Sequence, residues 1–448
     1  MNTTTTSVLP TPQNPARDGW DRVVLSSIWL VLAAWICFGL SSDGIDAVLG
    51  IVRRQGWQSH ALGPGLIWLY MAAAMLVVRT LLWVRYVPAP AARFEDAPTM
   101  TVIIPAYNEG AMVSRSIDSC AAADYPRDRL EILVIDDGSN DDTWQHICKA
   151  ASRHPNSVKT LRFASNQGKR EALAVGFERA KGDVVVTVDS DSLIDRSALL
   201  AIAGPFRDPR VGAVGGKVVV FNRFAGLLPR MLHIRFVLAF DFLRSVQSVY
   251  RTVYCCPGAL SAYRRSVLHR ILPHWREQTF LGAPCTIGED RALTNDILAA
   301  GFDTVYQRTA VVETIVPQTY RKLCRMLLRW DRSYIREELR MARVIWRRPF
   351  MARVFTAIDT TLTNLRYPVA YAALAMTVAF AYHDPWTLVR VAEAIGIGSL
   401  FYALYFLRSE RSWEFVYGVF YAYFAALALI WIFPYALLTV RNRAWLTR

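Results

Sequence analysis

Residues 183–192 read DVVVTVDSDS, a stretch that decides the fold of the domain around it. A β-branched run between polar residues is typical of a short buried strand. Asp189 and Asp191 follow this run directly. Ligands of open α/β sheets bind beyond the carboxyl ends of the strands, so we expect both carboxylates at a binding edge.

Three earlier runs repeat the pattern of an apolar strand followed by polar residues: MTVIIPAY (100–107), LEILVIDDGS (130–139) and VKTLRFAS (158–165). Stretches with helical character separate them at 112–123, 141–153 and 169–182. Alternating strands and helices predict a Rossmann-like parallel sheet with helices on both faces.

The polar clusters at this edge suggest a nucleoside diphosphate site. Asp189 and Asp191 lie two apart in an extended segment, so their carboxylates can share one hard cation, Mg²⁺ or Mn²⁺. Lys169 begins a helix, where its charge and the free amides suit phosphate oxygens. Asp136 or Asp137 can accept from a uracil amide or ribose hydroxyls. A lone D-x-D is more often a turn, but the clusters together favour the nucleotide interpretation.

The 448 residues are 53% hydrophobic, which predicts a membrane protein with a soluble domain. Apolar stretches of near-spanning length lie at 22–40, 62–84, 354–382, 385–407 and 413–440. We therefore expect the following organisation: a disordered tail at 1–21, two membrane helices in 22–97, an α/β domain at 98–318 and about three spans in 350–448.

Net charge and cysteine content predict the partners of the chain and the cellular compartment of its domain. The net charge of +14 lies largely beside the membrane segments, so we expect contact with lipid and an anionic small molecule rather than nucleic acid. The seven cysteines form no CxxC pair and are typical of free thiols in a reducing compartment. We expect a bacterial-type inner (plasma) membrane protein whose catalytic domain is cytoplasmic.

Residues 325–337, RMLLRWDRSYIRE, predict an amphipathic helix within an interfacial segment at 319–349. A second interfacial segment is expected at about 222–250. Taken alone, the arginines of the helix suit anionic lipid headgroups. The rest of the chain favours a second interpretation, in which the helix forms the floor of an active site.

These stretches, with CCPGALSAYRR (255–265), QTFLGAPCTIGEDRALTN (278–295) and LLRWDRSYIRE (327–337), resemble the processive membrane synthases among family 2 glycosyltransferases of the GT-A fold. Hyaluronan synthases and the nodulation chitooligosaccharide synthases are the most similar. The resemblance is dense from about 100 to 340. It implies an inverting transferase that joins UDP-sugars into a polysaccharide and exports the growing chain through its own spans.

The resemblance also implies roles for individual residues, and these fall into four sets. UDP contacts are implied for Ala106, Tyr107, Glu109, Asp137, Lys169 and Asp189, and metal binding for Asp189 and Asp191. Catalytic roles are implied for Glu289, Asp290 as general base, Arg329 and Trp330. Acceptor contacts are implied for Gln247, Gly258 and Trp330.

The pattern breaks at two positions on the acceptor side. Met326 replaces the glutamine of the Q-x-x-R-W motif, and Leu243 replaces the glutamate of E-R-A-A-Q-S. Three hypotheses therefore stay open: a hyaluronan synthase-like enzyme using UDP-GlcNAc and UDP-glucuronate, a chitooligosaccharide synthase using UDP-GlcNAc alone, and an inactive relative that acts as a membrane partner. A transferase acting on a lipid carrier is more distant, since that class typically lacks the arginine-tryptophan helix.

Overall fold

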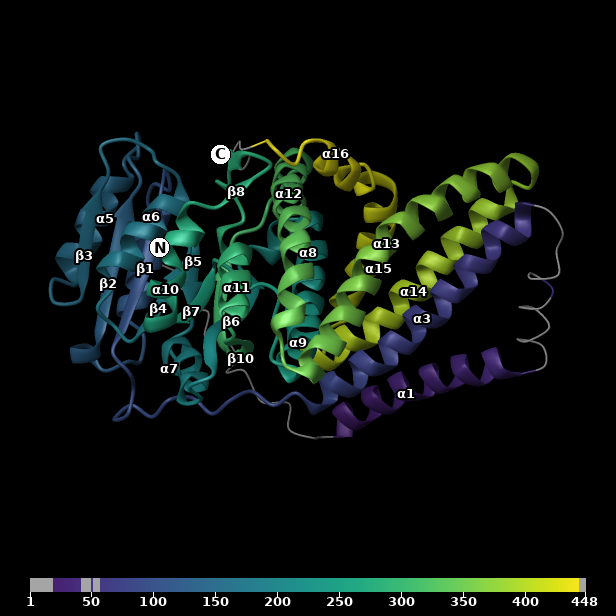
Figure 1. Cartoon of the computed structure of the whole chain (residues 1–448), viewed down its shortest axis with the longest axis horizontal. Coiled ribbons are helices and arrows are strands. Elements are labelled where there is room, and N and C mark those ends of the chain that lie inside the picture. The colour runs from purple at the N-terminus through teal and green to yellow at the C-terminus, as the bar shows by residue number, and fades with distance from the viewer. Residues whose placement is uncertain (1–18, 42–49, 51–56, 443–448) are drawn as a thin grey trace, which may run out of the picture.

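The computed structural model describes residues 19–41, 50 and 57–442, which form an α/β domain beside a group of long helices (Figure 1). Among these residues the main sheet has eight strands in the order β3-β2-β1-β4-β7-β6-β10-β5. The strands are β1 (Met100–Ala106), β2 (Leu130–Asp136), β3 (Val158–Arg162), β4 (Val184–Val188), β5 (Ser192–Ile194), β6 (Val211–Val220), β7 (Leu260–Arg264) and β10 (Asp303–Thr314).

The first four strands are parallel, as the sequence predicts. β1 pairs with β2 on one side and with β4 on the other, and β2 pairs with β3. The strand order therefore reverses at β1, between β2 and β4. Ligands of open α/β sheets bind outside the carboxyl ends of the strands at such a reversal.

The predicted parallel strands belong to a larger sheet that also has antiparallel pairs. β7 runs antiparallel to both β4 and β6, and β5 runs antiparallel to β10. Leu260, the first residue of β7, pairs with Val188, the last residue of β4. The chain before β7 therefore arrives at the carboxyl end of β4, beside the predicted site.

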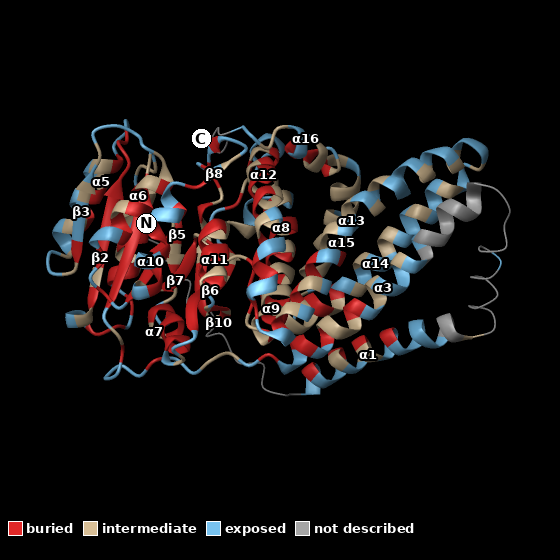
Figure 2. Ribbon diagram, viewed as in Figure 1, coloured by how far each residue is buried: buried red, intermediate tan, exposed pale blue. Residues whose placement is uncertain are grey.

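Helices cover both faces of the sheet, and each face has its own core (Figure 2). Along β1, Val102 and Ile104 belong to one core, with α4 (Met112–Ala121) and α5 (Thr143–Arg153). Ile103 belongs to the other core, where it packs with three helices: α6 (Lys169–Arg179), α10 (Arg265–Arg276) and α11 (Glu289–Ala299). This alternation is the period of two expected for a strand buried on both faces.

Three described helices are long and apolar enough to cross a membrane: Gly19–Cys37 in α1 (Gly19–Leu40), Ile67–Arg85 in α3 (Trp57–Arg85), and α14 (Trp386–Glu410). A bent pair, Trp413–Leu429 and Ile432–Leu438, is a fourth candidate with a 44° bend. It contains α15 (Val416–Phe424) and ends with α16 (Ile432–Leu438). α13 (Phe350–His383) coincides with the span predicted at 354–382 but does not meet the same apolar criterion.

The disordered tail predicted at 1–21 falls largely outside the described residues. Of the predicted disordered tail, residues 1–18 are not described, and Gly19 to Asp21 begin α1. At the other end, residues 443–448 are not described.

The predicted interfacial segments are helical. The segment around 222–250 forms α8 (Leu227–Val237), a π-helical stretch (Leu238–Arg244) and α9 (Ser245–Val249). The helix α12 (Tyr320–Val344) lies between the sheet and the long helices (Figure 1). Its arginines do not form one solvent-facing row, because Arg332 and Arg336 are 2% and 4% exposed.

Candidate active site

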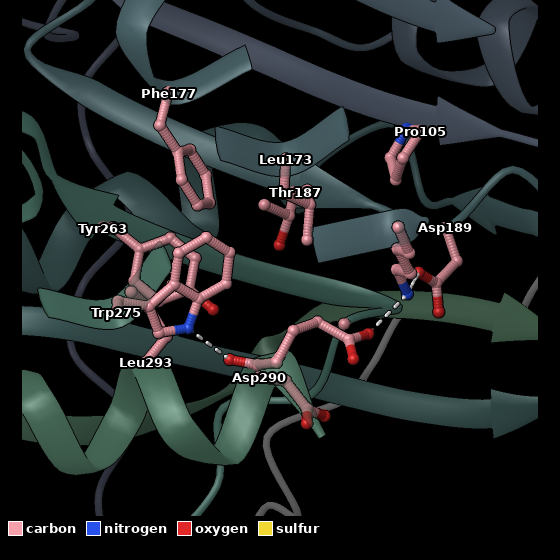
Figure 3. A pocket seen from close by; sticks show the side chains of 12 residues that line it. Pro105, Leu173, Phe177, Thr187, Asp189, Tyr263, Trp275, Asp290 and Leu293 are labelled. Atoms are coloured by element: carbon pink, nitrogen blue, oxygen red, sulfur yellow. Dashed lines mark hydrogen bonds and ion pairs between the residues drawn. The ribbon is translucent and has the colours of Figure 1, made fainter. Parts of the chain in front are cut away.

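A pocket lies at the carboxyl ends of β1 and β4, where the strand order reverses (Figure 3). One wall is polar and comes from four elements of the domain: Lys169, Asp189, Gly258, Glu289 and Asp290. The other wall is apolar and largely aromatic: Leu173, Phe177, Tyr263, Trp275 and Leu293. The structure thus brings together residues that lie 120 positions apart in the sequence.

Lys169 is the electrostatic centre of this pocket. Its Nζ lies 2.5 Å from Asp189 Oδ1 and 3.2 Å from Glu289 Oε1. Burial alone would lower the pKa of the ammonium group, but the two carboxylates outweigh it and raise this pKa. Lys169 therefore stays charged, and an anion that enters the pocket meets a fixed cation.

Because Gly258 has no side chain, the Lys169–Asp189 ion pair can lie close to the backbone of this loop. A Cβ atom on Gly258 would lie 3.1 Å from Lys169 Nζ and 3.3 Å from Asp189 Oδ1. A side chain here would crowd the ion pair. The resemblance implied an acceptor contact for Gly258, and the structure locates it beside Lys169 and Asp189, two of the predicted donor residues.

Two adjacent carboxyls at the start of α11 differ in their surroundings. Burial raises the pKa of Glu289, but Lys169 and then Arg329 lower it by more, so the carboxyl favours its charged form. The pKa of Asp290 is raised, first by burial and then by the charge of Glu289. Two carboxyls whose pKa values are pushed apart in this way suit different tasks.

The contacts of Asp290 are few. Its Oδ1 accepts from the Arg291 backbone N–H at 2.7 Å, and the Cys255 thiol lies 3.5 Å from its Oδ2. The Cys255 thiol thus touches the predicted base. Arg291 itself pairs with Glu338 of α12 at 2.7 Å.

Asp137 holds the loop that leads into α6. Its carboxylate accepts hydrogen bonds from the backbone N–H groups of Gln167 and Gly168, at 2.7 and 2.9 Å, and from Asn166 Nδ2 at 2.9 Å. Lys169 follows directly. In this structure, Asp137 therefore organises the loop that presents Lys169, whereas the sequence assigned it a direct contact with UDP.

Residues after β1 form the next side of the site. Ala106 is buried at the end of β1, and its carbonyl accepts from Asp137 N at 2.8 Å. Tyr107 and Glu109 follow and are partly exposed, and Glu109 Oε1 accepts from Ser190 Oγ at 2.7 Å. Ser190 lies between the two aspartates of the D-x-D motif, so this bond joins two of the predicted clusters.

The D-x-D carboxyls suit a divalent cation that is shared with a ligand. Burial and the charge of Asp189 raise the pKa of Asp191 to about 6. A bound cation would favour the ionised form of Asp191 and so lower this pKa. The described residues contain no group of three His, Cys, Asp or Glu side chains suited to a metal. Mg²⁺ commonly takes one or two carboxylates and completes its shell with water and substrate phosphates, so the pair fits that mode.

The helix α12 lies between the α/β domain and the long helices (Figure 1). The charge of Arg329 acts on both Lys169 and Glu289, which locates its guanidinium near the pocket. Trp330 lies on the adjacent face, where its ring centroid is 6.3 Å from that of Phe236 and the Arg235 guanidinium lies 5.8 Å from its centroid.

Gln247 lies one loop away from this pocket and is not among its lining residues. Its Oε1 accepts from the Tyr254 backbone N–H at 3.4 Å. It therefore contacts the loop that carries Cys255 rather than the polar wall itself.

Sequence reasoning missed the apolar wall and the Arg291–Glu338 pair. Phe177 lies on α6 and Trp275 lies on the amphipathic helix α10, and large apolar residues on such helices are usually core. Only the fold reveals that these rings also line the pocket. The sequence does place Arg291 directly after Asp290, but its partner is 47 residues away.

Comparison with known proteins yields one family and several curated relatives. Residues 101–272 match the family described as "Glycosyl transferase family 2". An N-acetylglucosaminyltransferase of Azorhizobium caulinodans is 31% identical over 353 residues, which cover 78% of this chain and 87% of that protein. A hyaluronan synthase of Streptococcus pyogenes is 33% identical over 361 residues, covering 78% and 83%.

A solved structure supports the fold. A mannosyltransferase from Pyrobaculum calidifontis, in complex with GDP-Man and Mn²⁺, matches with a TM-score of 0.56 and 23% identity, covering 81% of this chain and 98% of that one. At this identity the likeness concerns the fold alone, and it confirms the predicted GT-A architecture.

Proposed function

Since the chain belongs to glycosyl transferase family 2, we propose that it is a processive, inverting β-glycosyltransferase that polymerises UDP-sugars. The observation that carries the proposal is the meeting of Lys169, Asp189, Glu289 and Asp290 beneath α12. A diphosphate needs a cation and an attacking hydroxyl needs a base, and this pocket offers both.

Donor binding is assigned to the rim between β1, β2 and α6. Lys169 and the free amides at the start of α6 face the position for the diphosphate. We assign the uridine to the side of Tyr107, with Glu109 holding the D-x-D loop through Ser190. Asp189 and Asp191 are the ligands we assign to a divalent cation, Mg²⁺ or Mn²⁺, which would neutralise charge on the diphosphate when bound.

The transfer step is assigned to Asp290. Its carboxylate takes the proton of the acceptor hydroxyl as the acceptor oxygen bonds to the anomeric carbon of the donor. The bond from that carbon to the diphosphate breaks on the opposite side, and UDP leaves with the electron pair. An α-linked donor therefore gives a β-linked product without a covalent enzyme intermediate.

The acceptor is assigned to the α12 side of the pocket. The indole of Trp330 offers a flat apolar surface for the C–H face of a sugar ring. The charge of Arg329 lowers the pKa of Glu289, and we assign the Arg329 guanidinium to the leaving diphosphate. Transfer at a fixed place beside the long helices suits export of the chain through them.

We propose a multi-pass protein of the inner (plasma) membrane with a cytoplasmic catalytic domain and lipid around the long helices. The three helices long and apolar enough to span, the bent pair and the cysteines without a CxxC pattern support this arrangement. A cytoplasmic domain would meet nucleotide sugars where they are made, and the polymer would leave on the other side.

The remaining hypotheses differ in the donor sugars that the enzyme is expected to use. We propose UDP-GlcNAc and UDP-glucuronate as donors; relatives named N-acetylglucosaminyltransferase at similar identity support UDP-GlcNAc alone as the second candidate. The test is UDP release by the protein in nanodiscs with Mg²⁺ or Mn²⁺, given either donor alone or both. Sustained release with both, and a product cut by hyaluronidase, is expected. Release with UDP-GlcNAc alone and a chitinase-sensitive product would select the second candidate, and no release with any UDP-sugar would favour the inactive partner.

A further inference from the structure

The loop of residues 250–258, between α9 and β7, surrounds the candidate base. The Cys255 thiol lies 3.5 Å from Asp290 Oδ2. The backbone N–H of Cys256 donates to Thr294 Oγ1 at 3.0 Å, and this hydroxyl donates to the Asp290 carbonyl at 2.8 Å. The position of the loop therefore sets the immediate surroundings of Asp290.

The first part of the loop is fixed on the sheet. The Val253 N–H donates to the Thr304 carbonyl at 3.2 Å, and Thr304 Oγ1 donates to the Val253 carbonyl at 2.8 Å. Arg251 forms ion pairs of 2.5 Å with Asp303 and 2.6 Å with Asp208. Beyond Val253 the backbone leaves β10, and Tyr254 comes next.

Tyr254 is tied to the long helices through its hydroxyl. This hydroxyl donates to Asp359 Oδ2 in α13 at 2.8 Å and lies 2.7 Å from the Tyr250 hydroxyl. Asp359 is itself held by Arg79 of α3, with Nη2 at 2.7 Å from Oδ1. The Asp359 side chain is only 4% exposed, so the anchor is a buried, paired carboxylate.

A buried ion pair makes a stiff anchor. Moving Asp359 away from Arg79 would leave a charge in an apolar surrounding, which is strongly unfavourable. A hydrogen bond to an ionised carboxylate is also stronger than one between neutral groups. The Tyr254 hydroxyl therefore fixes the loop at a point one residue before Cys255.

We propose that Tyr254 is a positioning residue: its bond to Asp359 transmits the packing of α3 and α13 to the loop that contacts Asp290. This inference rests on the proposed function for the role of Asp290, but the anchor itself does not. The long helices would thus set the geometry of the base as well as surround the polymer.

The variant Tyr254→Phe tests the proposal, because it removes one hydroxyl and keeps the ring. Tyr405→Phe is the matched control: its buried hydroxyl lies 2.6 Å from Thr80 of the same helix α3 but has no link to the loop. Asp359→Asn is a second variant that weakens the same bond from the other side, and thermal unfolding checks that each protein is folded.

The first readout is alkylation of Cys255 by N-ethylmaleimide in nanodiscs, with Cys255→Ser identifying the labelled site. Loss of the anchor is expected to raise the labelling rate by about fivefold or more, since local opening further exposes a thiol that is half-buried in the wild type. Tyr405→Phe is expected to label at the wild-type rate. Labelling of Tyr254→Phe at the wild-type rate would overturn the proposal, whether or not the protein turns over UDP-sugars.

The second readout is steady-state kinetics with the UDP-sugars that the wild type accepts. Tyr254→Phe is expected to lower kcat by roughly tenfold with little change in the donor KM, because a small misplacement of a reacting group is costly. The acidic limb of its pH profile is expected to shift, since the surroundings of Asp290 change. Faster labelling with unchanged kcat and pH profile would mean that the anchor does not position the base. No turnover by the wild type would refute the proposed function separately.

Discussion

Glu289 and Asp290 are neighbours at the start of α11, yet their surroundings shift their pKa values in opposite directions. Lys169 lies 3.2 Å from Glu289 Oε1 and lowers its pKa, which suits a permanent anion. Asp290 has no such partner among the described residues, and burial raises its pKa. A carboxylate with a raised pKa is the better proton acceptor, so these surroundings support the proposed assignment of the base to Asp290.

Asp290→Asn is expected to lower kcat for UDP release by about 10²- to 10⁴-fold, because the amide cannot accept the proton. The dissociation constant for UDP, measured by calorimetry, is expected to stay close to wild type. In the wild type, activity is expected to fall as the pH drops through the raised pKa, at a pH above the usual aspartate value of about 4. Asp128→Asn, at an exposed loop position, is the control. Full activity of Asp290→Asn would refute the assignment.

The D-x-D pair leads to a prediction about metal and pH. Asp191 has a pKa of about 6, so it is largely protonated at pH 5 and ionised at pH 7.5. The raised pKa means that the ionised form of Asp191 destabilises the fold; this cost grows as the pH rises from the usual aspartate value of about 4 to about 6 and is fully present above 6. Mn²⁺ with UDP is therefore expected to raise Tm more at pH 7.5 than at pH 5. Thermal unfolding of the wild type and Asp191→Asn would check it, and equal shifts at both pH values in the wild type would contradict it.

At the level of elements, the sequence predicted β1 to β4 and α4 to α6 because each has a clear apolar period and polar ends. It also predicted the D-x-D motif, Lys169 and Asp290 as members of one site, and the structure brings Asp189, Lys169 and Asp290 to one pocket. The direction of β7 was not predictable, because it depends on where the preceding helices return the chain.

The helix α12 shows why part of the site escaped prediction. Its period indicated an arginine face toward lipid, but Arg336 donates to the Ile287 carbonyl and pairs with Glu337, and Arg332 donates to Thr439. These partners include residues 49 and 107 positions away. A single sequence does not show which distant residues are in contact. A buried polar face of a helix therefore has the same sequence pattern as a solvated one.

The departure at Met326 can now be interpreted on the helix that carries it. Met326 is 6% exposed and belongs to the apolar core, so its thioether acts as packing. Met326→Gln is expected to bury an unpartnered amide at a cost of about 1–3 kcal/mol in stability. Donor affinity is expected to stay unchanged. Thermal unfolding and calorimetry with UDP are the measurements, with Met326→Leu as the volume-conserving control; a large change in UDP affinity would contradict this placement.

At the scale of the whole molecule, three parts converge on one place. The sheet supplies Asp189 and α11 supplies Asp290. The helix α11 is joined to α12 through Arg291–Glu338 and through the bond of Arg340 to Asp296 at 2.5 Å, and α12 is joined to α13 through the bond of Tyr334 to Asn364 at 2.6 Å. In Figure 1 the long helices leave the domain from this side. An enzyme arranged in this way can add sugars at a fixed point and pass the product directly into its membrane part.

The most direct test of this account is the size of the product at low turnover. Purified protein in nanodiscs is given excess UDP-GlcNAc and UDP-glucuronate, one of them labelled, and the products are sized while most enzyme molecules have used few donors. A processive enzyme is expected to give long chains from the earliest time points, with untouched enzyme beside them, and Asp290→Asn is expected to give almost none. Products that lengthen one sugar at a time in step across the whole sample would contradict the account.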